Sequence, residues 1–429
     1  MYTKWLPTLV FGLSGIIGCG SSTPEPSNSA GAGGAPAGGA SGSSTGGAAT
    51  AGSSSGGSVT GGSASGGAMS GGAAGSGIAG GGASGGAATG GSAGASTGGR
   101  AGGGGASTGG SSGSGGSAGG GGGGDRTAVR ASAGCTVADG MKTLTTGGMS
   151  VAKGLPTSTI LKITSGGMSR EYVLDIPADY DPTHPYRLIF SWHQVGGSDV
   201  ANAIGQYPAN QGPNFDAEHY AFFGLQREAT AAKQPVIIVA PEGIGGTPWD
   251  YTRDVVLFDD LLALMDKNLC IDDNRVFATG FSFGAMMSYA LSITRQDKLR
   301  GVVAMAAANY NLPHEPMDSN KGPIAYMGTT GMSDTRCPWG SDTMGGKACN
   351  LVHAKDNGCT IPAAITMTTA GSKKYVCYDF EGCKAGYPVK ACTFDGNHTP
   401  SSVDDGSSNG DDGLKSFIPT ESWKFISQF

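Results

Sequence analysis

A serine lies at the centre of Gly280-Phe281-Ser282-Phe283-Gly284, a G-x-S-x-G pattern. The apolar run at 275–279 predicts a strand before it, and residues 285–291 predict a helix after it. Strand, tight turn and helix in this order are typical of a nucleophile elbow, where a serine hydroxyl projects from a strained turn. The glycines remove Cβ atoms that would clash as the chain reverses. We therefore predict a nucleophile at Ser282. The alternative is a structural turn, because a chain with 80 glycines contains accidental matches.

A serine nucleophile needs a base that takes its proton, and in this kind of site the base follows the serine in the chain. The histidines after Ser282 are His314, His353 and His398. His314 lies in a segment with surface-loop composition, and His353 lies in a predicted helix. His398 lies in the loop that follows a predicted strand at 388–394, where a base can reach the elbow. We predict that His398 is the base.

The base in turn needs a carboxylate that orients it. Asp334 follows the predicted strand that ends at Met327 by a few residues, which is the loop position this role requires. We predict Asp334 for the role. The less favourably placed alternatives are Asp342, Asp356, Asp379 and Asp395, the last of which we expect to form a turn beside Gly396.

The tetrahedral intermediate of ester hydrolysis needs two backbone N–H donors. Phe283, directly after the nucleophile, is one candidate. The loop His193-Gln194-Val195-Gly196-Gly197 resembles an HGGG-type oxyanion loop, so that Gln194 or Val195 is the other. A simple glycine turn is the alternative there.

Two residues near this edge of the sheet are candidates for contact with the substrate. Trp249 follows the predicted strand at 236–240 and is either a wall of the acyl pocket or a packing residue. His193 is a second candidate, although a structural loop histidine is the favoured interpretation.

Buried strands alternate with helices through the region that carries these residues. Apolar runs predict strands at 187–192, 236–240, 275–279, 301–305 and 323–327, and an antiparallel pair at 160–163 and 170–176. Helices are predicted at about 216–232, 254–269, 285–291, 350–355 and 421–429. This alternation indicates an α/β fold with a mostly parallel sheet and helices on both faces. With an antiparallel hairpin at its edge, the pattern suits the α/β-hydrolase fold.

The 429 residues divide into three parts. Residues 1–19 have the charge and apolar pattern of a signal peptide and end in Ile16-Ile17-Gly18-Cys19, which resembles a bacterial lipobox. We expect Cys19 to carry lipid, whereas the alternative is an ordinary signal peptide with an incidental cysteine. Residues 20–125 are rich in Gly, Ser and Ala and predict a disordered linker. Residues 126–429 have the composition of a globular domain. The chain would be exported and held at the cell surface, or secreted.

Charge and cysteine content exclude some classes of partner. The formal net charge is −6 without a run of Lys or Arg, so nucleic acid is not an expected partner. None of the cysteine spacings is that of a paired C-x-x-C zinc site, and we expect no metal and no cofactor. An even number of cysteines after Cys19 in an exported chain predicts disulfides. The eight are Cys135, Cys270, Cys337, Cys349, Cys359, Cys377, Cys383 and Cys392.

The pairing of these cysteines stays partly open. Cys377 and Cys392 flank a predicted hairpin and could face each other across it. Cys337 and Cys349 are close in sequence and could pair. These two choices leave four cysteines without an assigned partner.

The globular region resembles secreted feruloyl esterases related to carbohydrate esterase family one. The resemblance covers nearly all of 132–429. Its carriers are 186–190 with the His193 loop, 240–243, 275–284, 324–326, 333–334, 357–360, 381–383, 394–400 and 421–425. It implies Ser282 as nucleophile, Asp334 as orienting carboxylate and His398 as base, and it implies the disulfides Cys135–Cys270 and Cys359–Cys383. The segment 309–322 differs from the common pattern, and four cysteines (337, 349, 377 and 392) are additional to it.

The resemblance implies a serine esterase that releases ferulate or related hydroxycinnamates from arabinose groups on plant xylan. We expect the protein to be a monomer. The alternatives within the enzyme class are an acetylxylan esterase and a polyhydroxyalkanoate depolymerase. A carbohydrate-binding or adhesion lipoprotein without hydrolytic activity is an alternative from another class. Membrane contact would come through lipidated Cys19.

Overall fold

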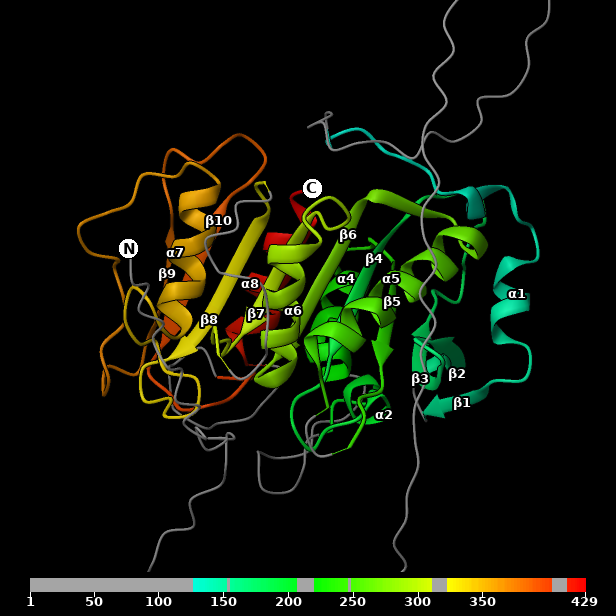
Figure 1. The fold of residues 1–429 in the computed structure, drawn as a ribbon, viewed down its shortest axis with the longest axis horizontal. Coiled ribbons are helices and arrows are strands. Elements are labelled where there is room, and N and C mark those ends of the chain that lie inside the picture. The colour runs from blue at the N-terminus through cyan, green and yellow to red at the C-terminus, as the bar shows by residue number, and fades with distance from the viewer. Residues whose placement is uncertain (1–125, 153–154, 207–219, 246–247, 311–321, 403–414) are drawn as a thin grey trace, which may run out of the picture. The chain divides into compact units, whose positions relative to one another are not determined.

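The computed structural model describes residues 126–429 except 153–154, 207–219, 246–247, 311–321 and 403–414 (Figure 1). The predicted signal peptide, Cys19 and the predicted linker lie outside the described residues. So do His314 and the first part of the helix predicted at 216–232.

Within the described residues, one sheet contains ten strands in the order β1-β2-β3-β5-β4-β6-β7-β8-β10-β9. From β5 to β10, neighbouring strands are parallel, whereas β1, β2, β3 and β9 pair antiparallel at the two edges. In sheet order, the strands are β1 (Met149–Ala152), β2 (Leu155–Ser165), β3 (Met168–Asp175), β5 (Val236–Pro241), β4 (Tyr186–Trp192), β6 (Ile271–Phe281), β7 (Gly301–Met305), β8 (Ala325–Gly331), β10 (Val389–Phe394) and β9 (Tyr375–Asp379).

Helices cover both faces of the sheet (Figure 1). α5 and α6 contact each other on one face, and α7 joins them there through its contact with α6. α4 and α8 contact each other on the opposite face. The helical elements are η1 (Ala133–Thr136), α1 (Gly140–Thr145), α2 (Asp199–Ala203), η2 (Ala221–Gly224), α4 (Leu225–Ala231), α5 (Tyr251–Asn268), α6 (Phe283–Thr294), α7 (Gly346–Asp356) and α8 (Phe417–Ser427).

This architecture is the predicted α/β-hydrolase fold. The central strands β5 and β7 are buried along their whole length, which explains their uninterrupted apolar sequences, because helices cover both of their faces. The strand predictions were correct in number and order for this central part. α1 and β1 were not predicted, since their short sequences carry no clear apolar period.

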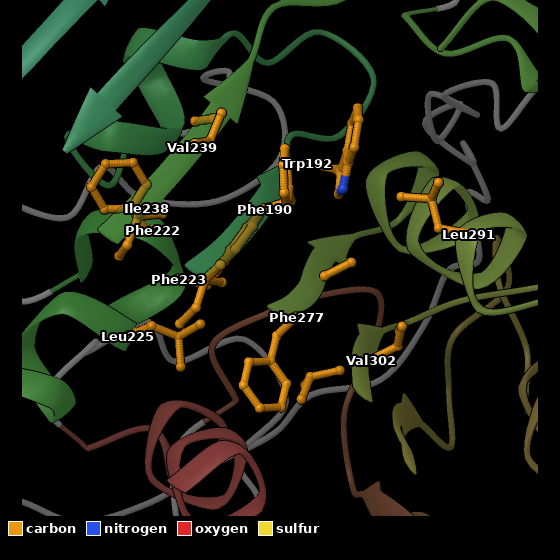
Figure 2. Close-up of a cluster of buried hydrophobic side chains, with 14 of the residues drawn as sticks. Phe190, Trp192, Phe222, Phe223, Leu225, Ile238, Val239, Phe277, Leu291 and Val302 are labelled. Carbon is orange, nitrogen blue, oxygen red and sulfur yellow. The ribbon is translucent and has the colours of Figure 1, made fainter. Parts of the chain in front are cut away.

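The core lies on both sides of the central strands (Figure 2). Phe190 and Phe277 come from neighbouring parallel strands and are fully buried. Leu225 approaches the sheet from α4, and Leu291 approaches from α6. At about 1.5–3 kcal/mol for each fully buried large apolar side chain, such contacts stabilise the sheet that carries the site. Among the helices of the described part of the chain, none combines the length and the apolar character needed to span a bilayer.

Three disulfides form, two as the resemblance implies and one as the hairpin predicts. They are Cys135–Cys270, Cys359–Cys383 and Cys377–Cys392, the last between directly opposed residues of β9 and β10. The predicted Cys337–Cys349 disulfide is wrong: the structure forms no bond between these two buried residues. The side chain of Cys349 lies beside the Tyr326 hydroxyl. The short distance in sequence between the two cysteines therefore does not lead to a disulfide.

A buried ion pair ties β3 to α5. Arg170 Nη1 lies 2.6 Å from Asp254 Oδ1, and the side chains are 2% and 0% exposed. The next residue of β3, Glu171, forms an ion pair at the surface instead. Its carboxylate lies 3.0 Å from Lys162 Nζ, and both side chains are well exposed. Removing one partner of a buried pair leaves a charge without compensation, whereas solvent replaces a lost surface partner.

We expect Asp254→Ala to lower the free energy of unfolding by about 3–5 kcal/mol, because it leaves the Arg170 guanidinium buried without its carboxylate. Glu171→Ala, the matched control on the same strand, should cost less than about 1 kcal/mol. Urea denaturation of both variants measures the difference. Equal losses in the two variants would contradict the assignment.

Candidate active site

The predicted elbow forms at the junction of β6 and α6. Ser282 has φ 55° and ψ −119°, a conformation that non-glycine residues rarely adopt. Such strain costs on the order of 1–3 kcal/mol and persists only where the surroundings impose it. Here the Ser282 N–H donates to the carbonyl of Met305 at the end of β7 (2.9 Å), and the Ser282 carbonyl accepts from Met286 N–H (3.0 Å).

Both glycines of the elbow are required by close backbone contact. A Cβ on Gly284 would lie 2.0 Å from the Trp192 carbonyl oxygen and 2.7 Å from that of His193. A Cβ on Gly280 would lie 2.5 Å from the carbonyl of Gly284. The first turn of α6 therefore packs directly on the end of β4, from which the predicted oxyanion loop starts.

The structure brings the three predicted catalytic side chains together. His398 Nε2 lies 2.8 Å from Ser282 Oγ, and His398 Nδ1 lies 2.7 Å from Asp334 Oδ2. A carboxylate accepts hydrogen bonds only, so the Nδ1 proton points to Asp334. The unprotonated Nε2 then faces the serine hydroxyl and can accept its proton.

Asp334 and His398 are held in position by residues outside the catalytic set. The Asp334 Oδ1 atom accepts the backbone N–H groups of Arg336 and Cys337, both at 2.8 Å. The imidazole of His398 lies against the ring of Phe281, with 4.7 Å between ring centres. The Asp334 side chain is fully buried and that of His398 is 9% exposed, so little water competes for these bonds. The N–H donors at 336 and 337 were missed in the sequence, although an aspartate two and three residues before them is typical of an Asx turn.

The alternatives to His398 and Asp334 lie elsewhere. His353 is buried between α6 and α7, where its Nε2 lies 2.8 Å from Ser292 Oγ and its ring stacks on Tyr326. Burial lowers the pKa of His353 to about 3, so this histidine stays neutral. Asp395 accepts the N–H groups of Gly371 and Lys373 and closes a turn, as predicted.

The candidate oxyanion donors lie on two segments that touch. Phe283 is the first residue of α6, so its N–H has no acceptor within the helix. Gln194 and Val195 begin a tight turn in which the Gly197 N–H donates to the Gln194 carbonyl (3.0 Å) and Gly196 has φ 74°. The contact of Gly284 with residues 192 and 193 sets this turn beside the elbow.

His193 holds the start of this loop. Its Nε2 accepts the Gly243 N–H (3.0 Å), and this fixes the proton on Nδ1, which donates to the Gln194 carbonyl (2.8 Å). The His193 carbonyl accepts from Trp249 Nε1 (2.7 Å). Burial lowers the pKa of His193 to about 4, so the ring stays neutral and remains an acceptor near neutral pH.

The candidate role of His193 and Trp249 in substrate contact is wrong, whereas the structural interpretation favoured for His193 and the packing alternative for Trp249 agree with the structure. His193 is 2% exposed with both ring nitrogens bonded, and Trp249 is 1% exposed and packs edge-on against Trp192. Both side chains lie beneath the loop and position it. The sequence could not separate the two roles, because a wall residue and a support residue follow the same strand.

A possible metal site among the described residues is already occupied by protein contacts. Cys377, Cys392 and Glu421 approach one another within 4.8 Å. The two sulfur atoms form a disulfide, and the Glu421 carboxylate binds Lys390 and Lys424.

Comparison with known proteins gives matches to esterases. Residues 257–341 match the family model Phospholipase/Carboxylesterase. Feruloyl esterase D of Neurospora crassa is 30% identical over 264 residues, which is 61% of this chain and 83% of the relative. Feruloyl esterase C of Emericella nidulans is 33% identical over 261 residues, with coverage of 60% and 83%. A solved ferulic acid esterase from Anaeromyces mucronatus is 17% identical, covers 48% of this chain and 82% of its own, and has a TM-score of 0.37.

The fold and the sequence matches define a carboxylic ester hydrolase with the α/β-hydrolase architecture. Identity of 30–33% to two curated feruloyl esterases, over 83% of the length of each, specifies the family within this class. The chain belongs to the feruloyl esterase family.

We expect Gly284→Ala to reduce stability by about 3 kcal/mol or more and to impair activity, because the added Cβ meets backbone that cannot move aside. Gly301→Ala is the matched control, since a Cβ there comes no closer than 3.2 Å to its neighbours. Thermal unfolding and ester hydrolysis measured on both variants test this. A Gly284→Ala protein as stable and active as the control would refute the packing argument.

Proposed function

We propose that this protein hydrolyses feruloyl esters with Ser282 as nucleophile, His398 as general base and Asp334 as the carboxylate that orients the base. The observation that carries the proposal is the continuous contact from Asp334 through His398 to Ser282, with 2.7 Å and 2.8 Å between the bonded atoms. Membership in the feruloyl esterase family supports feruloyl esters as the class of substrate.

In the first half of the reaction, Ser282 Oγ attacks the ester carbonyl while His398 Nε2 takes its proton. The imidazolium that forms is stabilised by the ionised Asp334 carboxylate. The N–H groups of Phe283 and of Gln194 or Val195 stabilise the oxyanion, and losing one such donor typically costs about 2.7–4 kcal/mol. The imidazolium then gives its proton to the leaving alcohol.

In the second half, water attacks the acyl group on Ser282, and His398 takes a proton from that water. The tetrahedral species collapses, the proton returns to Ser282 Oγ and the free acid leaves. These steps use side chains and backbone groups of the chain itself.

The proposed natural substrate is a hydroxycinnamoyl ester on arabinose groups of plant xylan. Support comes from the names of the curated relatives, which are feruloyl esterases. We further propose that the protein is exported, for which the three disulfides provide support, since such bonds persist in oxidising compartments. The lipid anchor at Cys19, the linker over 20–125 and the monomeric state belong to the same proposal and rest on the sequence.

We expect Ser282→Ala to abolish turnover of methyl ferulate without a change in thermal unfolding, because it removes the nucleophile and no core contact. Asp334→Asn should lower kcat by about 10⁴-fold, because an amide can stabilise the wrong histidine tautomer. Steady-state kinetics with methyl ferulate measure both effects, and Asp342→Asn, at an exposed aspartate, is the control for the second.

A panel of feruloyl, acetyl and hydroxybutyrate esters tests the acyl preference. Wild-type protein should react with a fluorophosphonate probe and Ser282→Ala should not. Retained turnover in Ser282→Ala would refute Ser282 as the nucleophile. Absence of both labelling and turnover in the wild type would favour a binding protein without hydrolytic activity.

A further inference from the structure

The loop that carries the second oxyanion donor is fixed at both ends. We call residues 193–198 the oxyanion loop. At its start, His193 binds Gly243 in the segment that follows β5. At its end, Ser198 caps α2 by accepting the Ala201 N–H with its hydroxyl oxygen (3.0 Å).

The second attachment of the loop is made by Glu242. Its Oε2 atom accepts the N–H of Asp199, the first residue of α2, at 2.7 Å. Glu242 directly precedes Gly243, so one short segment after β5 holds the loop at its start and at its end. The position of the loop relative to Ser282 therefore depends on Glu242.

This attachment brings two carboxyl groups together. The Asp199 side chain is 3% exposed and interacts with the Glu242 carboxyl group. Asp199 Oδ1 accepts the Val200 N–H (2.6 Å), whereas Oδ2 is buried and has no hydrogen-bond donor among the described residues when both acids are ionised. A proton on Glu242 would supply the missing donor.

The charged groups around the pair do not neutralise it. From β3, Glu171 adds a third negative charge near Glu242, and Lys162 on β2 pairs with Glu171 at the surface (3.0 Å). Arg170 donates a hydrogen bond to the Glu242 backbone carbonyl (2.7 Å), but its ion pair is with Asp254. Arg253 on α5 also forms an ion pair with Asp254. His193 Nε2 lies 3.9 Å from Glu242 Oε2, and burial keeps that ring neutral.

We propose that Glu242 and Asp199 form a proton-sharing carboxyl pair that positions the oxyanion loop, and that loss of the shared proton sets the alkaline limit of catalysis. This inference rests on the proposed function of the loop. Glu242 is a positioning residue in it, because it acts on the oxyanion through the loop.

The titration of Glu242 supports this proposal. Burial raises the pKa of Glu242 to about 8, and the neighbouring Asp199 and Glu171 carboxylates contribute to the rise. Burial also raises the pKa of Asp199. The folded chain thus binds the shared proton more tightly than the unfolded chain does. The stabilisation from this pair is complete at acid pH and is lost as the pH rises through 8.

Ionisation of both groups would place two buried carboxylates in contact and release the end of the loop. The N–H groups of Gln194 and Val195 would then lose their alignment with the oxyanion. Because these donors act on the transition state, we expect kcat to fall more than KM rises.

The test is the pH dependence of kcat for Glu242→Gln. The glutamine carbonyl can accept the Asp199 N–H and its amide can donate to Asp199, so this variant imitates the protonated pair at every pH. Wild-type kcat should fall about tenfold between pH 7 and pH 9, as a single group with a pKa of about 8 requires. The kcat of Glu242→Gln should stay level over that range, whatever its absolute value.

Glu171→Gln is the matched control, because it removes a neighbouring carboxylate that does not bond the loop. Its profile should keep an alkaline fall of the same depth, displaced toward lower pH because the Glu171 charge helps to raise the pKa of Glu242. Circular dichroism at each pH excludes unfolding. If Glu242→Gln does not fold, Asp199→Asn serves instead, since its amide donates to the Glu242 carboxylate. An alkaline fall that persists in a folded variant, or a wild type with level kcat to pH 9, overturns the proposal.

The same profiles measured with 4-nitrophenyl acetate separate this inference from the proposed function. An oxyanion loop serves any ester, so the pair can be tested even if feruloyl esters are not hydrolysed. Failure on methyl ferulate with a Glu242-dependent profile on the acetate would reject only the acyl assignment.

Discussion

The active site depends on the close contact of two backbone segments, the first turn of α6 and the end of β4. The contact is possible only because Gly280 and Gly284 lack side chains. A Cβ on Gly284 would lie 2.0 Å from the Trp192 carbonyl oxygen, and a Cβ on Gly280 would lie 2.7 Å from the same atom. Ser282 lies at this contact with a strained conformation, and the start of the oxyanion loop lies at the same point. Ser282 and the candidate oxyanion donors are thus positioned by one packing constraint.

The other residues of the site are held in place around this contact by hydrogen bonds from neighbouring segments. Asp334 is held by two N–H groups of its own loop and holds His398, which reaches Ser282. On the other side, His193 and Glu242 hold the oxyanion loop from the segment after β5. All these groups lie at the carboxyl ends of parallel strands, where an α/β sheet gathers loops that are distant in sequence.

The fold was predicted correctly, and Ser282, Asp334 and His398, which were predicted to act together, lie in hydrogen-bond contact; each of these predictions had a local signal in the sequence. A buried parallel strand has an apolar run, an elbow has two glycines at fixed spacing, and a loop after a strand identifies a base or a carboxylate. The roles of His193 and Trp249 stayed open between substrate contact and support of the loop, because local sequence does not tell whether a side chain points toward a ligand or beneath the loop. The predicted disulfide between Cys337 and Cys349 was wrong for a similar reason, because a short separation in sequence does not determine how two sulfur atoms are oriented.

The amino-acid sequence by itself determined the alternation of strands and helices, the elbow and the chemical types in the triad, because these follow from short-range patterns of apolar residues and glycines. Only the tertiary structure decided which buried groups meet: the His398 ring with Asp334, the His193 ring with Gly243, and the carboxyl groups of Glu242 and Asp199. These contacts join segments that are separated by tens of residues. Their strength comes from burial, which appears only when the sheet and its helices have packed.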